Sequence, residues 1–533
     1  MQRRHFIHHL AGGIALPTAA AATTAAAATR PGGNDELAYA SVADLQAQMQ
    51  AGSLNVLSLA RACIARIEAI DRNGPMLRSV IELNPEALDL AAALDAERRD
   101  RGPRGPLHGI PVLLKDNVAT ADAMQTTAGS LALVGAKAPR DAHLVTRLRA
   151  AGALILGKTN LSEWANIRST RSTSGWSARG GLTRNPHALD RNTSGSSSGS
   201  GAAVAAGLVP LAVGTETDGS IVSPASTCGL VGFKPTLGLV SRDGIVPISH
   251  SQDTAGPMTR SVADAALLLS AMAGPDPRDA ASGKAPLRVD YTRHLDVDGL
   301  KGARLGIVRS AFSGNDRVDP LYEQALRVLR ERGAVLVDDV QLPPADRYGE
   351  TELTVLLYEL KADLDAYLAE FGQGAPVRSL ADVIAFNEAN RTAEMPHFSQ
   401  ELLVRAQALG GLKSRAYREA LANNRRWSRT EGIDAALRRH KLDALVAPTG
   451  GPAWLTDFVN GDHYGGSFST PAAVAGYPHL TVPAGFVGGL PVGLSFVGPA
   501  WSEAKLFELG YAYEQATKAW RAPAFAASVS PRA

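Results

Sequence analysis

The amino-acid sequence predicts a fold of the α/β class. Short apolar runs that suit buried strands alternate with longer segments in which apolar residues recur at helical spacing, a pattern typical of a sheet covered by helices. The sequence contains no internal repeat and no coiled-coil heptad. Although 533 residues exceed the usual size of one domain, a large sheet can bury such a length as a single unit, so we expect one domain over residues 31–533.

The N-terminal half alternates helices and strands with recognisable boundaries. Ser41 and Asp44 suit the start of a helix, the turn NGP at 73–75 ends another, and the link RGPRGPLHG separates a third helix from the first strand. Small residues dominate the stretch after Gly199, so a helix there can pack its backbone close to its neighbours. The predicted elements are helices over 41–49, 57–70, 85–99, 141–151 and 199–208, and strands over 110–114, 153–156 and 210–214.

The C-terminal half offers fewer boundary signals. Residues 275–300 are polar and contain several prolines, which is typical of a surface excursion. Beyond it, three segments repeat apolar residues at helical spacing, and two short apolar runs suit late strands. The predicted elements are helices over 321–332, 351–371 and 399–439, and strands over 442–447 and 479–483.

Composition excludes several classes of partner and cofactor. The formal charge is only +2, so no strongly basic surface argues for nucleic acid. Cys63 and Cys228 are the only cysteines, which supports neither a disulfide framework nor a zinc site, and no H-E-x-x-H or clustered His/Asp spacing supplies other ligands. We predict no metal and no cofactor, and a small neutral molecule as the partner.

The first 30 residues suit an export signal. Arg3 and Arg4 precede a mildly apolar stretch and then an alanine-rich run with several A-x-A sites, which is the order found in twin-arginine signals. The alternative is a structureless N-terminus with a chance arginine pair. No other apolar stretch approaches the roughly 20 residues that a membrane helix needs. We expect residues 1–30 to be removed and the mature protein to be periplasmic or secreted, without a membrane anchor.

Candidate catalytic residues gather between Asn185 and Pro257. This run holds two serine clusters set in glycine, GSSSGSG and GTETDGSI, and no histidine lies between them. A serine nucleophile without a nearby imidazole needs another base. Lys115 offers one, because it follows the apolar run GIPVLL, and an ammonium group buried at such a position loses its hydration and part of its affinity for a proton.

These motifs resemble the amidase signature family. The resemblance runs from about residue 38 to about residue 520 and includes the strand lysine, the loop of serine and glycine, and the GTETDGSI turn. The phrases GTETDGSIV, FKPTLGLVSRDGIVPIS, SQDTAGPM, GPAWLTDFVNGD and GLPVGLSF are most similar to the peptide amidase branch of that family. The resemblance implies a three-layer α/β/α sandwich with a large mixed central sheet and a cleft at its centre.

The same resemblance implies a Ser-cisSer-Lys triad. Ser220 is the expected nucleophile, Ser196 the bridging serine after a cis peptide bond, and Lys115 the base. The nucleophile follows the bridging serine by 24 positions, as the family pattern requires. A lysine with a pKa of about 10.4 is a poor base at neutral pH, and lowering it to about 7 requires roughly 4 to 5 kcal/mol from burial and hydrogen bonding.

Residues around the nucleophile are expected to bind the substrate. Backbone N–H groups of a tight turn can converge on a developing oxyanion, so the expected oxyanion hole comprises Thr217, Asp218, Gly219 and Ser220. The family usually has glycine where Asp218 stands, which suggests that this side chain also faces the substrate. Packing is the alternative for the aromatic residues and for Ser130. The expected substrate contacts are Ser130, Asp218, Trp454, Phe458, Asn460 and Tyr464.

Other motif matches are better explained without catalysis. GALILGKT at 152–159 satisfies the P-loop expression, but its four variable positions are apolar and suit a buried strand. GSSSG at 195–199 matches a nucleophile elbow, yet no strand precedes it, and SEAK at 502–505 suits the start of a surface helix. Asn185 and Arg191 stand at signature positions, where we expect them to anchor the serine loop.

The residues and the resemblance together predict an exported amidohydrolase. We expect it to remove the C-terminal carboxamide of peptides as ammonia through an acyl-enzyme, and to act as a monomer. The main alternative is a broad amidase or esterase of the same family that acts on small aliphatic or aryl amides. A glutaminase component of an aminoacyl-tRNA amidotransferase is a second alternative, which the export signal argues against. A non-catalytic binding protein is a third, which the intact triad positions argue against.

Overall fold

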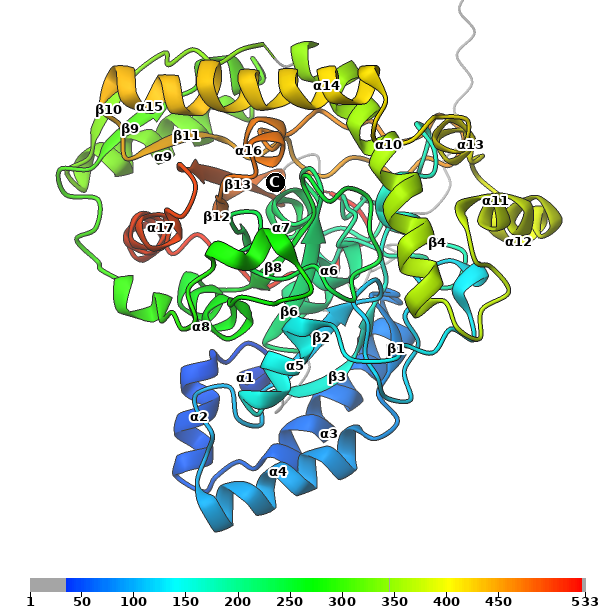
Figure 1. Ribbon diagram of the computed structural model, residues 1–533. Coiled ribbons are helices and arrows are strands. Elements are labelled where there is room, and N and C mark those ends of the chain that lie inside the picture. The colour runs from blue at the N-terminus through cyan, green and yellow to red at the C-terminus, as the bar shows by residue number, and fades with distance from the viewer. Residues whose placement is uncertain (1–34, 345, 530–533) are drawn as a thin grey trace, which may run out of the picture.

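Eleven strands form one mixed sheet through the centre of the described part of the chain (Figure 1). The computed structural model describes residues 35–344 and 346–529, so the expected export signal at 1–30 lies outside the described residues. The strand order is β1-β3-β2-β6-β8-β7-β12-β13-β11-β9-β10, and a two-stranded hairpin, β4-β5, is separate. The strands are β1 (Val80–Leu83), β2 (Pro111–Lys115), β3 (Leu154–Thr159), β4 (Trp176–Ser177), β5 (Gly181–Leu182), β6 (Leu211–Glu216), β7 (Val231–Lys234), β8 (Thr254–Thr259), β9 (Arg304–Ile307), β10 (Val335–Val337), β11 (Ala444–Pro448), β12 (His479–Val487) and β13 (Leu490–Val497).

Helices surround this sheet. In Figure 1 the N-terminal helices α1 to α4 form its lower end, and α14 and α15 cross its top. The α-helices are α1 (Asp35–Ala38), α2 (Val42–Gln50), α3 (Val56–Arg66), α4 (Ala87–Arg101), α5 (His143–Ala150), α6 (Ser198–Ala205), α7 (Val222–Thr227), α8 (Val262–Met272), α9 (Asp319–Glu331), α10 (Asp346–Phe371), α11 (Leu380–Ala389), α12 (Arg391–Glu394), α13 (Glu401–Gln407), α14 (Arg415–Arg425), α15 (Asp434–His440), α16 (Thr470–Ala475) and α17 (Glu503–Thr517). Two π-helices, η1 (Ile67–Arg72) and η7 (Arg426–Ile433), continue α3 and α14, and the 3-10 turns are η2 (Leu131–Leu133), η3 (Glu163–Asn166), η4 (Ala280–Lys284), η5 (Tyr291–His294) and η6 (Arg309–Ala311).

Strand β12 shows that helices cover both faces of the sheet. Side chains alternate between the two faces along a strand. Leu480 lies against α17, where a Cβ added to Gly510 would meet it at 2.3 Å. Its neighbour Thr481 points the other way, because a Cβ added to Gly493 of β13 would lie between Thr481 and Ser226 of α7. The α/β/α sandwich with a large mixed central sheet is therefore confirmed.

The parallel strands β3, β2 and β6 bring Lys115 to one edge of the sheet. β2 pairs in parallel with both neighbours, with Leu114 opposite Val213 of β6. Because parallel strands point the same way, their carboxyl ends meet at one edge. Lys115 is the last residue of β2 and thus lies beside Thr215, near the end of β6. Every residue of the two strands is buried, as expected for parallel strands covered on both faces.

Most predicted elements of the N-terminal half are confirmed, with small shifts at their ends. Ser41 and Asp44 form a capping box at the start of α2. The segment that matches the P-loop expression contains the buried strand β3, with Lys158 inside it. The SEAK segment begins α17, and 275–300 contains only the short turns η4 and η5.

Two predictions are wrong in detail. Residues 399–439 do not form one helix, because the segment 408–414 interrupts it at Gly410 and Gly411 and separates α13 from α14. Glycine weakens a helix by its conformational freedom, and here the end of α13 is held by Lys361 Nζ, which donates to the carbonyl of Gln407 at 2.9 Å. Six sheet strands were not predicted, namely β1, β7, β8, β9, β10 and β13. In β8 the sequence TAGPMT has low strand propensity, and pairing with β6 and β7 overrides it.

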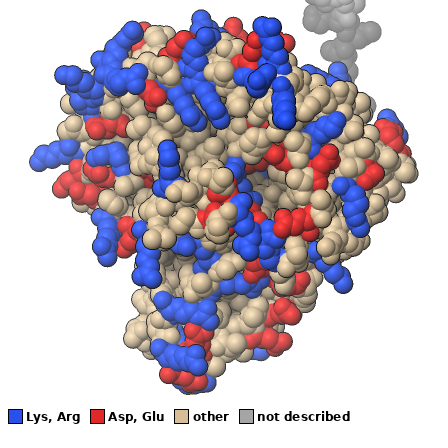
Figure 2. All heavy atoms as spheres, viewed as in Figure 1, with Lys and Arg blue, Asp and Glu red and all other residues tan. Residues whose placement is uncertain are grey.

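The remaining expectations from composition concern cysteine, membranes and charge. Cys63 and Cys228 are free and buried, and burial raises the pKa of each thiol to about 12, so neither is a reactive thiolate at neutral pH. Among the described residues, no helix combines the length and apolar character that crossing a bilayer requires. On the face in Figure 2, Lys and Arg are mixed with Asp and Glu around a central hollow.

Candidate active site

Lys115 lies at the end of β2 in a fully buried position. Its Nζ donates to Ser196 Oγ at 2.7 Å, to Thr215 Oγ1 at 2.9 Å and to the Thr215 carbonyl at 3.1 Å. Asn117 Nδ2 also donates to Thr215 Oγ1, at 2.9 Å, and so fixes that hydroxyl. The hydrogen-bond partners of the amine within the described residues are neutral oxygen atoms.

Burial controls the protonation of this amine. Desolvation lowers the pKa of Lys115 to about 7, and the charges of Asp253 and Glu216, which favour the ammonium form, offset it only in part. Burial also raises the pKa of Asp253 to about 6. A substantial fraction of Lys115 is therefore a neutral amine at neutral pH and can accept a proton.

A hydrogen bond between backbone groups connects the two serine segments. Ser197 N donates to the carbonyl of Ser220 at 3.2 Å, which places the residue after Ser196 against the expected nucleophile. The peptide bond between Gly195 and Ser196 is cis, as the resemblance implies. A Cβ at Gly195 would meet Ser162 Oγ at 2.2 Å, so only glycine fits there. Lys115, Ser196 and Ser220 are thus brought to one edge of the sheet from three separate segments.

The turn at 217–220 presents backbone donors to a cavity. Across the described ranges, none of its four backbone N–H groups has an acceptor. Gly219 has a φ of +79°, and a Cβ there would meet Ser469 Oγ at 2.9 Å. Glu216 Oε2 accepts from the N–H groups of Ile221 and Val222 at 2.7 and 3.1 Å and holds the start of α7, so the turn is anchored on both sides. This geometry suits stabilisation of an oxyanion.

Two adjoining cavities open at this turn. The smaller has a volume of about 370 Å³ and is lined by residues 217–220 and 165–167. The larger has a volume of about 1140 Å³ and is lined mainly by the segments around 308–318 and 448–471. The two cavities are adjacent, since they share the wall residues Ser223, Asn460, Gly461, Asp462 and Tyr464.

The predicted contacts of the late loop divide between the cavities and the exterior. Trp454, Asn460 and Tyr464 line the larger cavity. Phe458 lines neither cavity, and its ring stacks on His397 with 3.9 Å between the ring centroids. The structure therefore brings three of these four residues to the cavities and leaves Phe458 outside them.

The other predicted residues lie in separate environments. Ser130 is buried and donates to Glu394 Oε1 at 3.2 Å, and it lines neither cavity. Asn185 anchors the loop as expected, because its Nδ2 donates to the carbonyl of Thr227 at 2.9 Å. Arg191 lies in the wall of the larger cavity and pairs weakly with Asp190, at 3.4 Å.

A loop over 248–253 supports the turn and was missed by sequence reasoning. Thr217 Oγ1 donates to Asp253 Oδ1 at 2.5 Å, and Gln252 Nε2 donates to the Thr217 carbonyl at 3.2 Å. In the sequence, Gln252 and Asp253 stand out only as part of the phrase SQDTAGPM. That phrase contributes to the resemblance but indicates no role for either residue. Spacing could not show that this loop folds back on Thr217, because the contact spans 36 residues.

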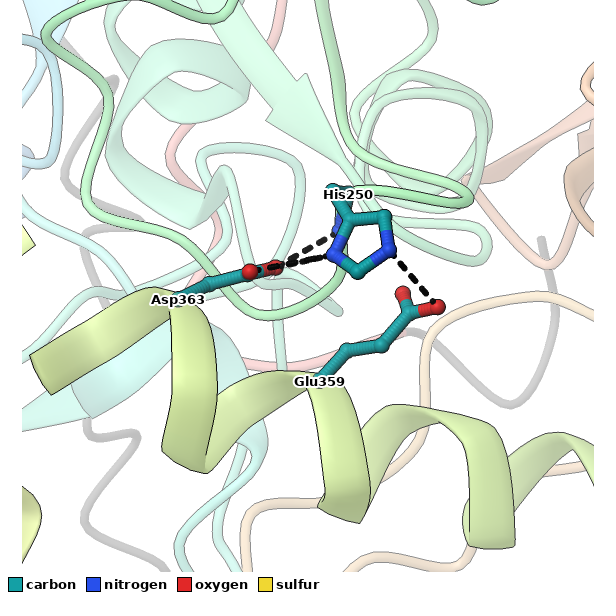
Figure 3. Close-up of side chains that lie close together, drawn as sticks. All are labelled: His250, Glu359 and Asp363. Carbon is teal, nitrogen blue, oxygen red and sulfur yellow. Dashed lines mark hydrogen bonds and ion pairs between the residues drawn. The ribbon is translucent and has the colours of Figure 1, made fainter. Parts of the chain in front are cut away.

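One group of potential metal-ligating side chains occurs in the described residues, and it joins this loop to α10. His250, Glu359 and Asp363 face one another, the two carboxylates coming from α10 (Figure 3). His250 Nδ1 lies 2.8 Å from Asp363 and its Nε2 lies 3.2 Å from Glu359. The hydrogen bond with Asp363 raises the pKa of His250, which favours an imidazolium bridging two carboxylates. The arrangement is an ion-pair network that attaches the loop to α10.

The chain belongs to the amidase family, because the sequence model described as Amidase matches residues 58–507. It is similar to the native peptide amidase of Stenotrophomonas maltophilia, with 58% identity and a TM-score of 0.87, over 91% of this chain and 98% of that one. A probable amidase of Arabidopsis thaliana is 44% identical, over 86% of this chain and 87% of the relative. A glutamyl-tRNA(Gln) amidotransferase component of Chloroflexus aurantiacus is 37% identical, over 91% and 98%. The protein is therefore a hydrolase that acts on amide C–N bonds.

Proposed function

We propose that the protein removes the C-terminal carboxamide of peptides, giving a free acid and ammonia, with Ser220 as nucleophile, Ser196 as bridging serine and Lys115 as base. The observation that carries this proposal is the 2.7 Å hydrogen bond from Lys115 Nζ to Ser196 Oγ, at the sheet edge where the turn of Ser220 meets a cavity. Similarity to a peptide amidase over 98% of its length supports the substrate class.

Acylation uses the two serines and the lysine in sequence. Neutral Lys115 accepts the Ser196 proton, Ser196 accepts the proton of Ser220, and Ser220 Oγ bonds to the amide carbon while the carbonyl electron pair moves to oxygen. The backbone N–H groups of 217–220 stabilise the oxyanion, and each such donor is typically worth about 3 kcal/mol of barrier. Lys115 returns its proton through Ser196 to the amide nitrogen, the C–N bond breaks, and ammonia leaves.

Deacylation reverses the same proton path. Water takes the place of ammonia, loses a proton to Ser196 and Lys115, and bonds to the ester carbon through its oxygen. As the bond from the carbon to Ser220 Oγ breaks, the proton returns to Ser220. The free acid leaves and ionises at neutral pH. One water is consumed for each carboxamide, and no cofactor takes part in this scheme.

The larger cavity suits the peptide part of the substrate. A carboxamide with its carbonyl carbon at Ser220 occupies the smaller cavity of about 370 Å³, and the adjacent cavity of about 1140 Å³ leaves space for several preceding residues. Trp454 and Tyr464 offer rings against which apolar side chains can pack. An aliphatic or aryl amide would fill the smaller cavity alone, which is the arrangement expected for the alternative of a broad amidase.

Ammonia release from a panel of amides tests the proposal. The panel comprises a C-amidated dipeptide, its free acid, a fatty amide, an aryl amide and free glutamine, assayed with the wild type, Ser220→Ala and the control Ser198→Ala. We expect the amidated dipeptide to be the best substrate and Ser220→Ala to lose at least about a thousandfold in kcat. A preference for the fatty or aryl amide would support the broad amidase, and a preference for glutamine would support an amidotransferase component.

We further propose that the mature protein is a monomer in the periplasm or outside the cell. The arginine pair at positions 3 and 4 and the alanine-rich run that follows support export. Replacing Arg3 and Arg4 by lysine should leave the protein in the cytoplasm, as cell fractionation would detect. Analytical ultracentrifugation of the exported protein measures its oligomeric state, and the mass of a dimer would contradict the proposal that it is a monomer.

A further inference from the structure

Helix α10 presents three carboxyl side chains along one face. Glu359 and Asp363 follow Glu352 by seven and eleven residues, which corresponds to about two and three helical turns. All three contact the loop over 248–253. Glu359 is fully buried and accepts from Ser251 Oγ at 2.6 Å, and Asp363 accepts from the backbone N–H of His250 at 2.9 Å. Figure 3 shows Glu359 and Asp363 reaching toward His250 from this helix.

Glu352 is the member of this row that reaches the expected oxyanion turn. Gln252 Nε2 donates to Glu352 Oε1 at 2.8 Å and to the carbonyl of Thr217 at 3.2 Å, so one amide group joins the helix to the turn. The carboxyl of Glu352 also lies near that of Asp218, whose charge acts on it. Thr470 Oγ1 donates to Asp218 Oδ2 at 2.6 Å.

Two neighbouring carboxyl groups that are both buried are not ionised together, because like charges repel strongly where water is excluded, so one of them keeps a proton. Glu352 keeps this proton. Burial, followed by the charge of Asp218, raises the pKa of Glu352 well above its ordinary value. A second negative charge here would also oppose the oxyanion that forms at the adjacent turn.

We propose that Glu352, in its protonated form, is a positioning residue for the oxyanion turn: it accepts from Gln252, places no second negative charge beside Asp218, and so keeps the backbone N–H groups of 217–219 directed at the cavity. The inference rests on the proposed role of Ser220 and its turn. Glu352 lies 132 residues from Ser220 and does not touch the substrate, so its effect falls on transition-state stabilisation more than on binding.

The test compares Glu352→Ala, Glu352→Gln and the control Glu350→Ala, an exposed acid of the same helix. Glutamine reproduces the protonated carboxyl, with an oxygen for Gln252 and no negative charge beside Asp218. On an amidated dipeptide, we expect Glu352→Ala to lower kcat at least about tenfold with KM changed less than about threefold, and Glu352→Gln to recover at least about a third of the wild-type kcat. Glu350→Ala should match the wild type.

Two results would overturn the proposal. One is a Glu352→Ala enzyme with a kcat within about threefold of wild type, and the other is a Glu352→Gln enzyme as slow as Glu352→Ala although it unfolds at the wild-type temperature. If Glu352→Ala does not fold, Gln252→Met removes the same bridge, and a normal kcat in that variant would contradict the proposal. Ser220→Ala, assayed in parallel, separates the outcomes: turnover in that variant counts against the proposed function and not against Glu352.

Discussion

Two fully buried lysines lie on the neighbouring parallel strands β2 and β3, one register position apart, so their side chains point to opposite faces of the sheet. They differ in what surrounds the amine. Lys115 of β2 donates to the hydroxyl of Ser196, whereas Lys158 of β3 donates to the carbonyl of Val118 at 2.6 Å and to Thr126 Oγ1 at 2.8 Å. Burial lowers the pKa of Lys115 to about 7 and that of Lys158 to about 8.

The comparison shows that desolvation alone does not make a base. Each amine is hydrogen-bonded to a hydroxyl, but the hydroxyl next to Lys115 belongs to Ser196, whose segment contacts the proposed nucleophile Ser220. Lys158 instead faces the buried carboxylate of Asp116, whose charge favours the ammonium form. The neighbouring acceptor, and not the degree of burial, separates a candidate catalytic lysine from a structural one.

Replacing each lysine by methionine is the strongest way to break this comparison. Methionine fills a similar volume without an amine. Lys115→Met should lower kcat for amide hydrolysis by at least about a hundredfold, because the proton of Ser196 loses its acceptor. Lys158→Met should keep kcat within about fivefold. Steady-state ammonia assays measure both, and equal losses in the two variants would show that Lys115 has no special role.

The stability of the same two variants sharpens the distinction. Lys158→Met removes one of the two cations near buried Asp116, leaving Arg179, and removes the donor to Val118 and Thr126, so it should lower the free energy of unfolding by about 1 to 3 kcal/mol. Urea unfolding followed by circular dichroism gives this value. An unchanged midpoint would mean that water or Thr126 replaces the lost donor.

The pH dependence of activity should follow Lys115. The neutral amine is the active form, so kcat/KM should rise with pH and level off above about 7. Thr215 Oγ1 accepts from the ammonium form, and Thr215→Val should therefore shift the midpoint of the rise to lower pH. A profile that is flat between pH 5 and 9 in the wild type would contradict the assignment of a titrating lysine.

The smallest effect on activity is expected for two aromatic residues of the loop over 454–464. Like the two lysines, they are of similar type and differ in their surroundings. Tyr464 lines both cavities and Phe458 lines neither. Tyr464→Ala should raise KM for an amidated dipeptide by about three- to tenfold and KM for a small fatty amide by less, because the peptide contacts the ring in both cavities and the small amide in one. Phe458→Ala should change neither value. The measurement is the ratio of KM for the dipeptide to KM for the fatty amide in each variant. An unchanged ratio in Tyr464→Ala would contradict the prediction.

Much of the fold and the centre of the candidate site follow from the sequence by itself. The apolar run before Lys115 is long enough to make a buried strand and ends at the lysine, so its burial and lowered pKa could be expected. The GTETDGSI segment could be expected to form a tight turn, because Gly219 permits the positive φ that such a turn needs. These features are local, and the residue types alone determine them.

Only the tertiary structure decided which distant groups support that centre. Strand β8 has weak strand propensity and is stabilised by pairing with β6 and β7, which no local pattern reveals. Gln252 and Glu352 reach Thr217 and Asp218 from a loop and a helix that fold back across the sheet. Phe458 and Tyr464 stand six residues apart in one loop, and only packing separates the ring at the cavity from the ring outside it. Such contacts depend on three-dimensional packing between segments, which sequence spacing does not specify.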